Sequence, residues 1–413
     1  MTKSPPAADD RKGSAIAVAV SLGVTQTIGY GSLYYAFGVL TPAMAADTGL
    51  SLTSIYGLFS LALVLAGSVA GRVGALLDRR HPAMIMSAGS LVGAVILFAW
   101  AAIPGKPAFA LLLIAGQLVS VLVLYEAAFV AAAHLVEPSL VRRTITGITF
   151  IAGFASTIFW PLTQWLASAM DWRGVYLVYA MLNLAICLPL HLMLWRRFAP
   201  VRHDIAPTSV HRSRSQQSAQ ADKVLRRRMA VLLTAGFAAT AFVISATHLH
   251  LIGLLGQIGL AGSAAMIGAL IGPSQVAARV VEFVSAQRIS IHAASIGSAL
   301  ALPLALAVLL AGAPGVAPAV VFAVMFGAGQ GLSYIVRGVL PLELFGRQGF
   351  GAFSGKINAV RLYVSAGAPF VIAWLFENGG PQAALAALIA VGSVGVLALG
   401  SVAVLARGAA APD

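Results

Sequence analysis

The feature that most constrains this chain is a series of apolar stretches, each about 20 residues long, that recur along its whole length. Each stretch is long enough to cross the roughly 30 Å hydrocarbon core of a bilayer as a single helix. Hydrophobic residues make up 59% of the sequence and charged residues only 9%, which is too few to cover the surface of a water-soluble protein of this size. The sequence therefore predicts an all-α integral membrane protein.

We expect twelve transmembrane helices, because twelve apolar stretches are separated by segments that contain the turn-forming residues Gly, Pro, Asn and Asp. The predicted spans lie near residues 14–40, 51–71, 83–103, 108–133, 144–168, 174–195, 229–252, 262–286, 291–311, 317–340, 354–376 and 382–406. The one long polar segment, 196–228, is rich in Arg, Ser and Gln and predicts a flexible linker. It divides the chain into two six-helix bundles, 1–195 and 229–413.

Lysine and arginine residues are confined almost entirely to alternate segments between the predicted spans. If the N-terminus lies inside, the outer loops contain only Lys106 and Arg173, as the positive-inside rule predicts. We therefore expect a multi-pass protein of the cytoplasmic (inner) membrane with both termini in the cytoplasm.

The net charge of +13 indicates no nucleic-acid partner, because no aromatic platform or nucleic-acid-binding fold accompanies it. A second role for the linker, as a patch that binds anionic lipid headgroups, stays open.

The segment between the second and third predicted spans has the sequence GRVGALLDRRHP, residues 71–82. It resembles the signature loop of the major facilitator superfamily, in which a glycine precedes an Asp-Arg pair by four residues. Gly74, Asp78 and Arg79 match that pattern, whereas His81 stands where a further glycine is expected. The resemblance implies two pseudo-symmetric six-helix bundles that rock around a central site. It also implies that Gly74, Asp78 and Arg79 form a latch at the cytoplasmic face.

Two charged residues, Arg279 and Glu282, lie one helical turn apart inside the eighth predicted span. A charge in the hydrocarbon costs about 2.5–3.5 kcal/mol on insertion scales, and a partner or an aqueous cavity removes most of that cost. On a helix, Gly272, Gln275, Arg279 and Glu282 share one face. We therefore predict that this face lines a cavity in which Arg279 binds an anionic group, with Gln275 beside it. The alternative is a purely structural Arg279–Glu282 pair, or side chains that reach the inner surface.

The spacing of Gly272, Gln275 and Arg279 resembles the eighth span of the monocarboxylate-porter branch of the superfamily. In that branch an aspartate precedes the arginine by one turn, and the pair handles an organic anion and a proton. Gln275 replaces the aspartate here and cannot titrate. The resemblance therefore implies anion recognition through Arg279, but it does not imply the proton chemistry of the branch.

Glu126 is the only acidic residue inside a predicted span of the N-terminal half. A carboxyl group in apolar surroundings takes up a proton more readily than in water, so Glu126 is the first candidate for proton coupling and Glu282 is the second. A permanent ion pair between Glu126 and an arginine of the other half is the alternative. Arg361, in the eleventh span, is a second candidate for binding the anion. Arg337 lies nearer an inner helix end and is a weaker candidate.

Polar and small residues, with some aromatic ones among them, recur at helical spacing on several predicted spans. The further candidates for the substrate site, as walls of the cavity, are Tyr34, Tyr125, Trp160 and Tyr334. Stripes of this kind are also typical of helix–helix packing in membranes.

The leading hypothesis is a secondary active transporter that moves a small anionic organic solute by alternating access, as a symporter or antiporter coupled to protons. Its expected partners are the solute, protons and the lipid bilayer, and it is expected to act as a monomer. Two alternatives stay open: a proton-driven efflux pump for a drug-like or toxic compound, and a membrane sensor that does not transport. We expect no enzymatic activity, cofactor or metal, because the sequence contains no nucleophile–base set, phosphate-binding loop or metal-ligand spacing.

Overall fold

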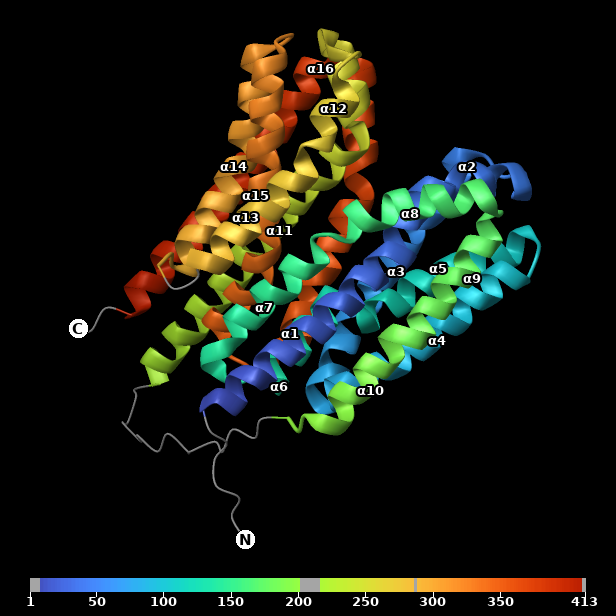
Figure 1. The fold of residues 1–413 in the computed structure, drawn as a ribbon. Coiled ribbons are helices and arrows are strands. Elements are labelled where there is room, and N and C mark those ends of the chain that lie inside the picture. The colour runs from blue at the N-terminus through green and yellow to red at the C-terminus, as the bar shows by residue number, and fades with distance from the viewer. Residues whose placement is uncertain (1–7, 201–215, 286–287, 411–413) are drawn as a thin grey trace.

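The structure is a computed structural model of the 413-residue chain, and it describes residues 8–200, 216–285 and 288–410. Helices joined by short loops make up this described part, which contains no β-strand. Two bundles of helices stand side by side and converge toward one end (Figure 1). Eleven continuous apolar helices in the described part are long enough to cross a membrane, and the last of them is bent into two arms. The predicted all-α membrane fold with twelve spans in two bundles is confirmed.

In the N-terminal bundle, several spans consist of consecutive helical pieces. The elements are α1 (Ala8–Tyr30), the π-helical turn η1 (Gly31–Tyr35), α2 (Ala36–Thr48), α3 (Leu52–Arg79), α4 (Pro82–Ala102), α5 (Lys106–Val123), α6 (Tyr125–Leu135), α7 (Pro138–Ala152), α8 (Ala155–Ala169), α9 (Trp172–Leu182), the π-helical turn η2 (Asn183–Cys187) and α10 (Leu188–Arg197). The pieces of one span follow each other directly, so each span still crosses the whole bundle.

The C-terminal bundle ends in a long bent helix. Its elements are α11 (Gln216–Leu255), the π-helical turn η3 (Gly256–Leu260), α12 (Ala264–Ala269), α13 (Ile271–Ser285), α14 (Ile291–Gly312), α15 (Val316–Phe345) and α16 (Phe350–Ala410). α16 bends at Gly380, whose φ of 74° is left-handed and favours glycine. The first arm places Gly355 against Ala70 of α3, and the second arm places Gly392 against Pro303 of α14. The two arms are the predicted spans 354–376 and 382–406.

Two segments differ from the prediction. Most of the segment 71–82 is the last part of α3 rather than a loop, because no proline interrupts the helix before Pro82. The predicted linker is shorter than 196–228, because α10 ends at Arg197 and α11 already begins at Gln216. Residues 201–215 of that segment lie outside the described residues.

An interruption in the fourth span determines where the acidic side chain of the N-terminal bundle lies. Leu124 separates α5 from α6 with an extended backbone conformation (φ −82°, ψ −169°). The side-chain amide of Gln26 donates a hydrogen bond to the carbonyl of Val123 at 2.7 Å, which satisfies the backbone at the break as a membrane interior requires. α6 therefore begins at Tyr125, with Glu126 in its first turn. A carboxylate is favoured there by the positive end of the helix dipole.

The hydrophobic core shows where the two bundles meet. One cluster of buried residues joins them, with Phe129 and Ile145 from the N-terminal bundle and Val339 and Phe350 from the C-terminal bundle. Two further clusters are each confined to a single bundle. The bundles thus share a core over only part of their length.

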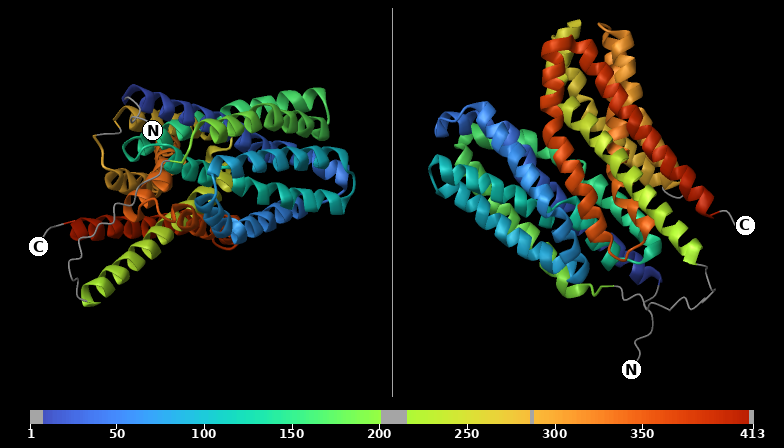
Figure 2. Two further views of the ribbon diagram at one scale, coloured as in Figure 1. Left: turned by 90° about the horizontal axis from the view of Figure 1, so that it is seen from below. Right: turned by 180° about the vertical axis from the view of Figure 1, so that it is seen from behind.

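The shared core lies toward the end of the molecule at which α3 ends at Arg79 and α10 ends at Arg197, which we call the basic end (Figure 1). Toward the opposite end, which we call the far end and which carries the bend at Gly380, the bundles diverge (Figures 1 and 2). The structure therefore has one closed end and one end at which the bundles are apart.

Candidate substrate and proton site

A carboxylate and two guanidinium groups from opposite bundles meet between the membrane-spanning helices. The Oε1 atom of Glu126 lies 3.4 Å from Nη2 of Arg337 and 3.8 Å from Nη2 of Arg361. The three side chains are 13%, 12% and 20% exposed, so all of them are mostly buried. Glu126 comes from the first turn of α6, Arg337 from α15 and Arg361 from the first arm of α16. The cluster therefore crosses the interface between the bundles.

The interaction within this cluster is electrostatic rather than a direct hydrogen bond. Neither Oε1 of Glu126 nor Nε and Nη2 of Arg337 has a hydrogen-bond partner in the described part of the chain. Arg361 instead donates two hydrogen bonds to Oδ1 of Asn358, at 3.0 and 2.6 Å. Buried polar atoms without hydrogen bonds cost free energy. A ligand that forms hydrogen bonds with these atoms of Glu126 and Arg337 would therefore recover that free energy.

Arg279 is held by backbone carbonyls of both bundles. Its guanidinium donates to the carbonyl of Thr149 in α7 at 3.0 Å and to that of Gly331 in α15 at 3.3 Å, and its side chain is 2% exposed. It also donates to Oε1 of Gln275 at 3.4 Å. A Cβ at position 153 would overlap this guanidinium, so Gly153 leaves the room that Arg279 needs. Arg279 therefore bridges the bundles from α13.

Tyrosine rings surround the charged groups. The ring of Tyr334 lies 5.1 Å from the guanidinium carbons of both Arg279 and Arg337. Tyr125 packs against Tyr334 at 5.6 Å and against Tyr30 at 4.7 Å between ring centroids. Aromatic faces attract guanidinium groups, and this attraction stabilises the arginines in low-dielectric surroundings.

Positive charge exceeds negative charge at this site. Among the described residues of the cluster, the three guanidinium groups of Arg279, Arg337 and Arg361 accompany the single carboxylate of Glu126, a formal excess of two positive charges. A buried charge without a compensating partner is destabilising. This arrangement favours an anion as its ligand.

Glu282 lies apart from this cluster. Its Oε1 atom accepts a hydrogen bond from Nη2 of Arg142 at 2.8 Å, and its side chain is 2% exposed. The same nitrogen of Arg142 donates to the carbonyl of Ile289. The partner of Glu282 is thus Arg142 of α7, near the basic end, and not Arg279 one turn away on α13.

Comparisons with known proteins identify the fold and the family. A family model described as Major Facilitator Superfamily matches residues 22–362. The chain belongs to the major facilitator superfamily. It is therefore a membrane transporter by family. A separate search of curated proteins finds no match to this chain.

Solved structures of other superfamily members share the architecture. The human organic anion transporter MFSD10 (TETRAN) is 15% identical, with a TM-score of 0.69 over 96% of this chain and 100% of that chain. The transporter FucP in the outward conformation is 15% identical, with a TM-score of 0.70 over 96% and 99%. The proton:xylose symporter XylE, bound to 6-bromo-6-deoxy-D-glucose, is 14% identical, with a TM-score of 0.68 over 94% and 95%. At these identities the likeness establishes the shared fold.

The basic end of this major facilitator protein is closed by contacts between α3 and α16. Both carboxylate oxygens of Asp78 accept hydrogen bonds at 2.8 Å, from the backbone N–H groups of Gly351 and Ala352 in the first turn of α16. The positive end of the helix dipole favours the carboxylate in this position. Gly74 lies directly against the carbonyl of Gly351, where no Cβ fits. Arg79, next to Asp78, is exposed.

We expect Gly74→Ala to open the basic end. A Cβ at this position would overlap the backbone carbonyl of Gly351, which cannot rotate aside as a side chain can. The bundles must then separate, so the distance between spin labels at the exposed positions Arg80 and Gln348 should increase by several ångströms. Pulsed electron paramagnetic resonance in a Cys187→Ser background measures this distance.

The matched control is Gly71→Ala on the same helix, because a Cβ there would meet only Lys356, with Cγ at 3.4 Å and the backbone nitrogen at 3.9 Å, both ordinary contact distances. This variant should keep the parent distance. Equal distances in Gly74→Ala and Gly71→Ala would show that the close approach at Gly74 does not hold the basic end closed.

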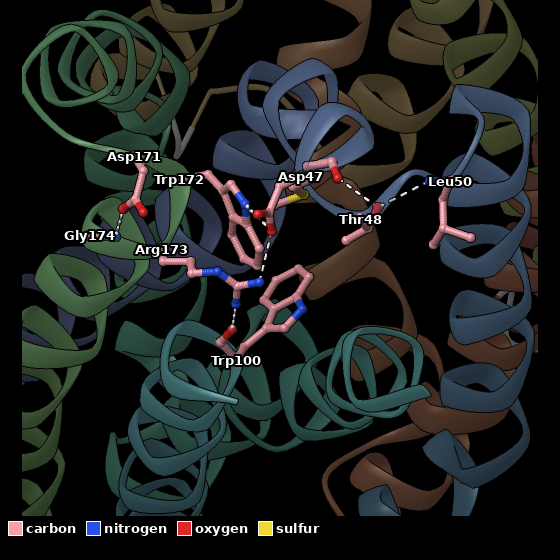
Figure 3. Close-up of polar contacts among 9 residues, drawn as sticks. Asp47, Thr48, Leu50, Trp100, Asp171, Trp172, Arg173 and Gly174 are labelled. Carbon is pink, nitrogen blue, oxygen red and sulfur yellow. Dashed lines mark hydrogen bonds and ion pairs between the residues drawn. The ribbon is translucent and has the colours of Figure 1, made fainter. Parts of the chain in front are cut away.

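A second polar cluster lies at the far end of the N-terminal bundle (Figure 3). Oδ2 of Asp47 accepts hydrogen bonds from Arg173 at 2.7 Å and from the indole N–H of Trp172 at 3.2 Å. Arg173 also donates to the carbonyl of Trp100, and its guanidinium lies 4.3 Å from the centroid of the Trp172 ring. Because all these residues belong to one bundle, the cluster fastens the far ends of α2, α4 and α9 to each other. It is separate from the candidate site.

The structure brings together most of the side chains that the sequence suggested for this site. Residues from both bundles that meet there are Glu126, Arg361, Arg279, Gln275, Tyr125 and Tyr334. The side chain of Trp160 lies outside the described residues. Arg337 is central although the sequence favoured it least, because Tyr334 and Arg337, three positions apart on α15, both face Tyr125.

Proposed function

We propose that this transporter carries an organic anion together with a proton across the cytoplasmic membrane. The observation that supports the proposal is the convergence of Arg337 and Arg361 on the single carboxylate of Glu126, with Arg279 against the same Tyr334 ring as Arg337. The excess positive charge favours an anionic solute and disfavours a cationic drug. A human neighbour in structure, described as an organic anion transporter, is consistent with such a solute.

The proposed anion site lies between Arg337 and Arg361. A carboxylate of the solute would accept hydrogen bonds from Nε and Nη2 of Arg337, which have no hydrogen-bond acceptor in the described part of the chain. Guanidinium groups bind carboxylates through two parallel hydrogen bonds, so one anionic group can use both nitrogens. Arg279, positioned by Gln275, would supply the third positive charge on the other side of Tyr334.

Proton coupling follows from competition for these arginines. The ionised carboxylate of Glu126 occupies the same positive groups that the solute needs. When Glu126 takes up a proton, it no longer competes, so proton binding and anion binding favour each other. A solute that enters with a proton is then carried as a symported pair. Glu282, bonded to Arg142 near the basic end, would act in holding the bundles together.

Alternating access would use the two ends of the molecule differently. The positive-inside rule places the basic end in the cytoplasm, so the conformation described above would be outward-facing, with Gly74, Asp78 and Arg79 forming the cytoplasmic latch. A crevice of about 10 Å³ between Glu126 and Gly351 has room for about one water molecule. This crevice would be the start of the proton route toward the cytoplasm.

The proposal is tested by uptake into proteoliposomes that contain the purified protein. Radiolabelled carboxylates should accumulate against their concentration gradient when the outside is acidified, and collapse of the pH gradient should abolish the accumulation. Liposomes without protein are the control for passive entry of the protonated acids. Absence of carboxylate binding and uptake at every pH would contradict the proposed function.

A further inference from the structure

A continuous series of aromatic rings leads away from the arginines toward the far end. It begins at Tyr334 of α15 and passes through Tyr125, Tyr30, Tyr34, Phe59 and Phe37 to Tyr56, with successive ring centroids 5.6, 4.7, 6.4, 5.9, 4.5 and 6.0 Å apart. Tyr56 lies in the second turn of α3, which begins at the far end. The series therefore connects the charged cluster with the end at which the bundles diverge.

The rings next to the arginines face the interface between the bundles. The ring of Tyr125 lies 5.9 Å from the guanidinium carbon of Arg337, Tyr30 packs against Tyr125, and Tyr34 packs against Tyr30. Tyr34 is 45% exposed, although it lies well inside the first span. An exposed ring in the same series as Tyr125 offers its surface to a ligand.

The hydroxyl groups of these tyrosines are not used in the protein. In the part of the chain that the structure describes, the hydroxyls of Tyr30, Tyr34, Tyr125 and Tyr334 make no hydrogen bond to another residue, and those of Tyr30, Tyr125 and Tyr334 are not fully enclosed. Hydroxyls in such positions are hydrated or bind a polar ligand. Tyr125 is buried in the shared core at 4% exposure, whereas Tyr34 is exposed and can offer a ring face as well as its hydroxyl to a ligand.

We propose that the transported solute is an aryl carboxylate, in which an aromatic ring carries the anionic group. This inference rests on the proposed function, since the carboxylate would bind Arg337 and Arg361. The ring would then lie against Tyr34, in the edge-to-face arrangement that aromatic pairs prefer and that Tyr34 already makes with Tyr30.

The test compares three acids of similar size on the purified wild-type protein by isothermal titration calorimetry. Benzoate has a planar aromatic body, cyclohexanecarboxylate has a saturated ring of nearly the same volume, and gluconate has a hydroxylated chain. We expect benzoate to bind about tenfold more tightly than cyclohexanecarboxylate, as aromatic contacts of this kind provide, and more tightly still than gluconate.

A variant identifies the ring that makes the contact. Tyr34→Leu should remove most of the preference, so that benzoate and cyclohexanecarboxylate bind within about twofold of each other. Phe98→Leu is the matched control, because Phe98 is also exposed, at 57%, but belongs to α4 and takes no part in the ring series. It should leave the preference unchanged.

The outcomes separate this inference from the proposed function. Equal binding of benzoate and cyclohexanecarboxylate to the wild type, or tighter binding of gluconate, would overturn the aromatic substrate and leave anion transport intact. A preference for benzoate that persists in Tyr34→Leu would overturn the placement of the ring against Tyr34. No binding of any of the three acids, or of other carboxylates, would count against the proposed function itself.

Discussion

Replacing Arg361 with glutamine is expected to lower the affinity of the transporter for an organic anion by about ten- to a hundredfold. Arg361 would add a charge-assisted hydrogen bond to those from Arg337, and such a bond is worth about 1.5–3 kcal/mol, which is about ten- to a hundredfold in the dissociation constant. Glutamine keeps an amide that can still donate to Asn358, so the packing of α16 should change little. Isothermal titration calorimetry of the purified variant measures the effect.

The matched control for this substitution is Lys356→Gln. Lys356 lies on the same arm of α16 and carries the same charge, but it is exposed and outside the cluster, so its replacement should leave anion affinity within about twofold of the parent. Arg361→Lys should give an intermediate loss, because an ammonium group keeps the charge but not the planar pair of donors. If Arg361→Gln and Lys356→Gln bound the anion equally well, Arg361 would not be an anion-binding residue.

Glu126→Gln is expected to separate solute movement from proton movement. In the wild type, acidification should raise anion affinity, because protonation of Glu126 removes the carboxylate that competes for Arg337 and Arg361. The glutamine variant resembles the protonated form at every pH. Its affinity for the anion should therefore be high and independent of pH wherever the solute remains ionised. Exchange of solute across proteoliposomes should persist, whereas uphill accumulation driven by a pH gradient should be lost.

Glu343→Gln serves as the control, since Glu343 is half exposed near the basic end and its carboxylate lies 3.8 Å from the imidazole of His292, apart from the charged cluster. This variant should retain both the pH dependence of binding and the uphill accumulation. A Glu126→Gln protein that still accumulated solute in response to a pH gradient would show that the proton is carried by another group.

Much of the architecture was predictable from the sequence because a bilayer permits few backbone conformations. A backbone in hydrocarbon must satisfy its own hydrogen bonds, so a 20-residue apolar stretch is helical whatever surrounds it. The break between the predicted spans 354–376 and 382–406 was expected from the turn-forming residues there, and the structure bends α16 at Gly380. The segment 71–82 identified the superfamily, although most of it proved to be helix.

The candidate site was predictable in part. Glu126, Arg279 and Arg361 can be recognised in a sequence, because a charge inside a span is costly unless it has a partner or faces an aqueous cavity. Their partners do not stand out. The contact of Glu126 with Arg337 joins residues more than 200 positions apart, and Glu282 contacts Arg142 rather than its neighbour on the helix. No spacing rule predicts contacts between helices of different bundles.

The sequence by itself determined the lipid-crossing helices, the family and the presence of charges that lipid cannot accommodate, since each depends on residue type and on distances along one helix. Only the tertiary structure decided which charges meet, that Gly74 must lie against a backbone carbonyl, and that a series of rings leads from Tyr334 toward the far end. The physical reason is that the backbone hydrogen bonds of a helix in a membrane are made within its own segment. The packing of two bundles depends instead on how all their surfaces fit together.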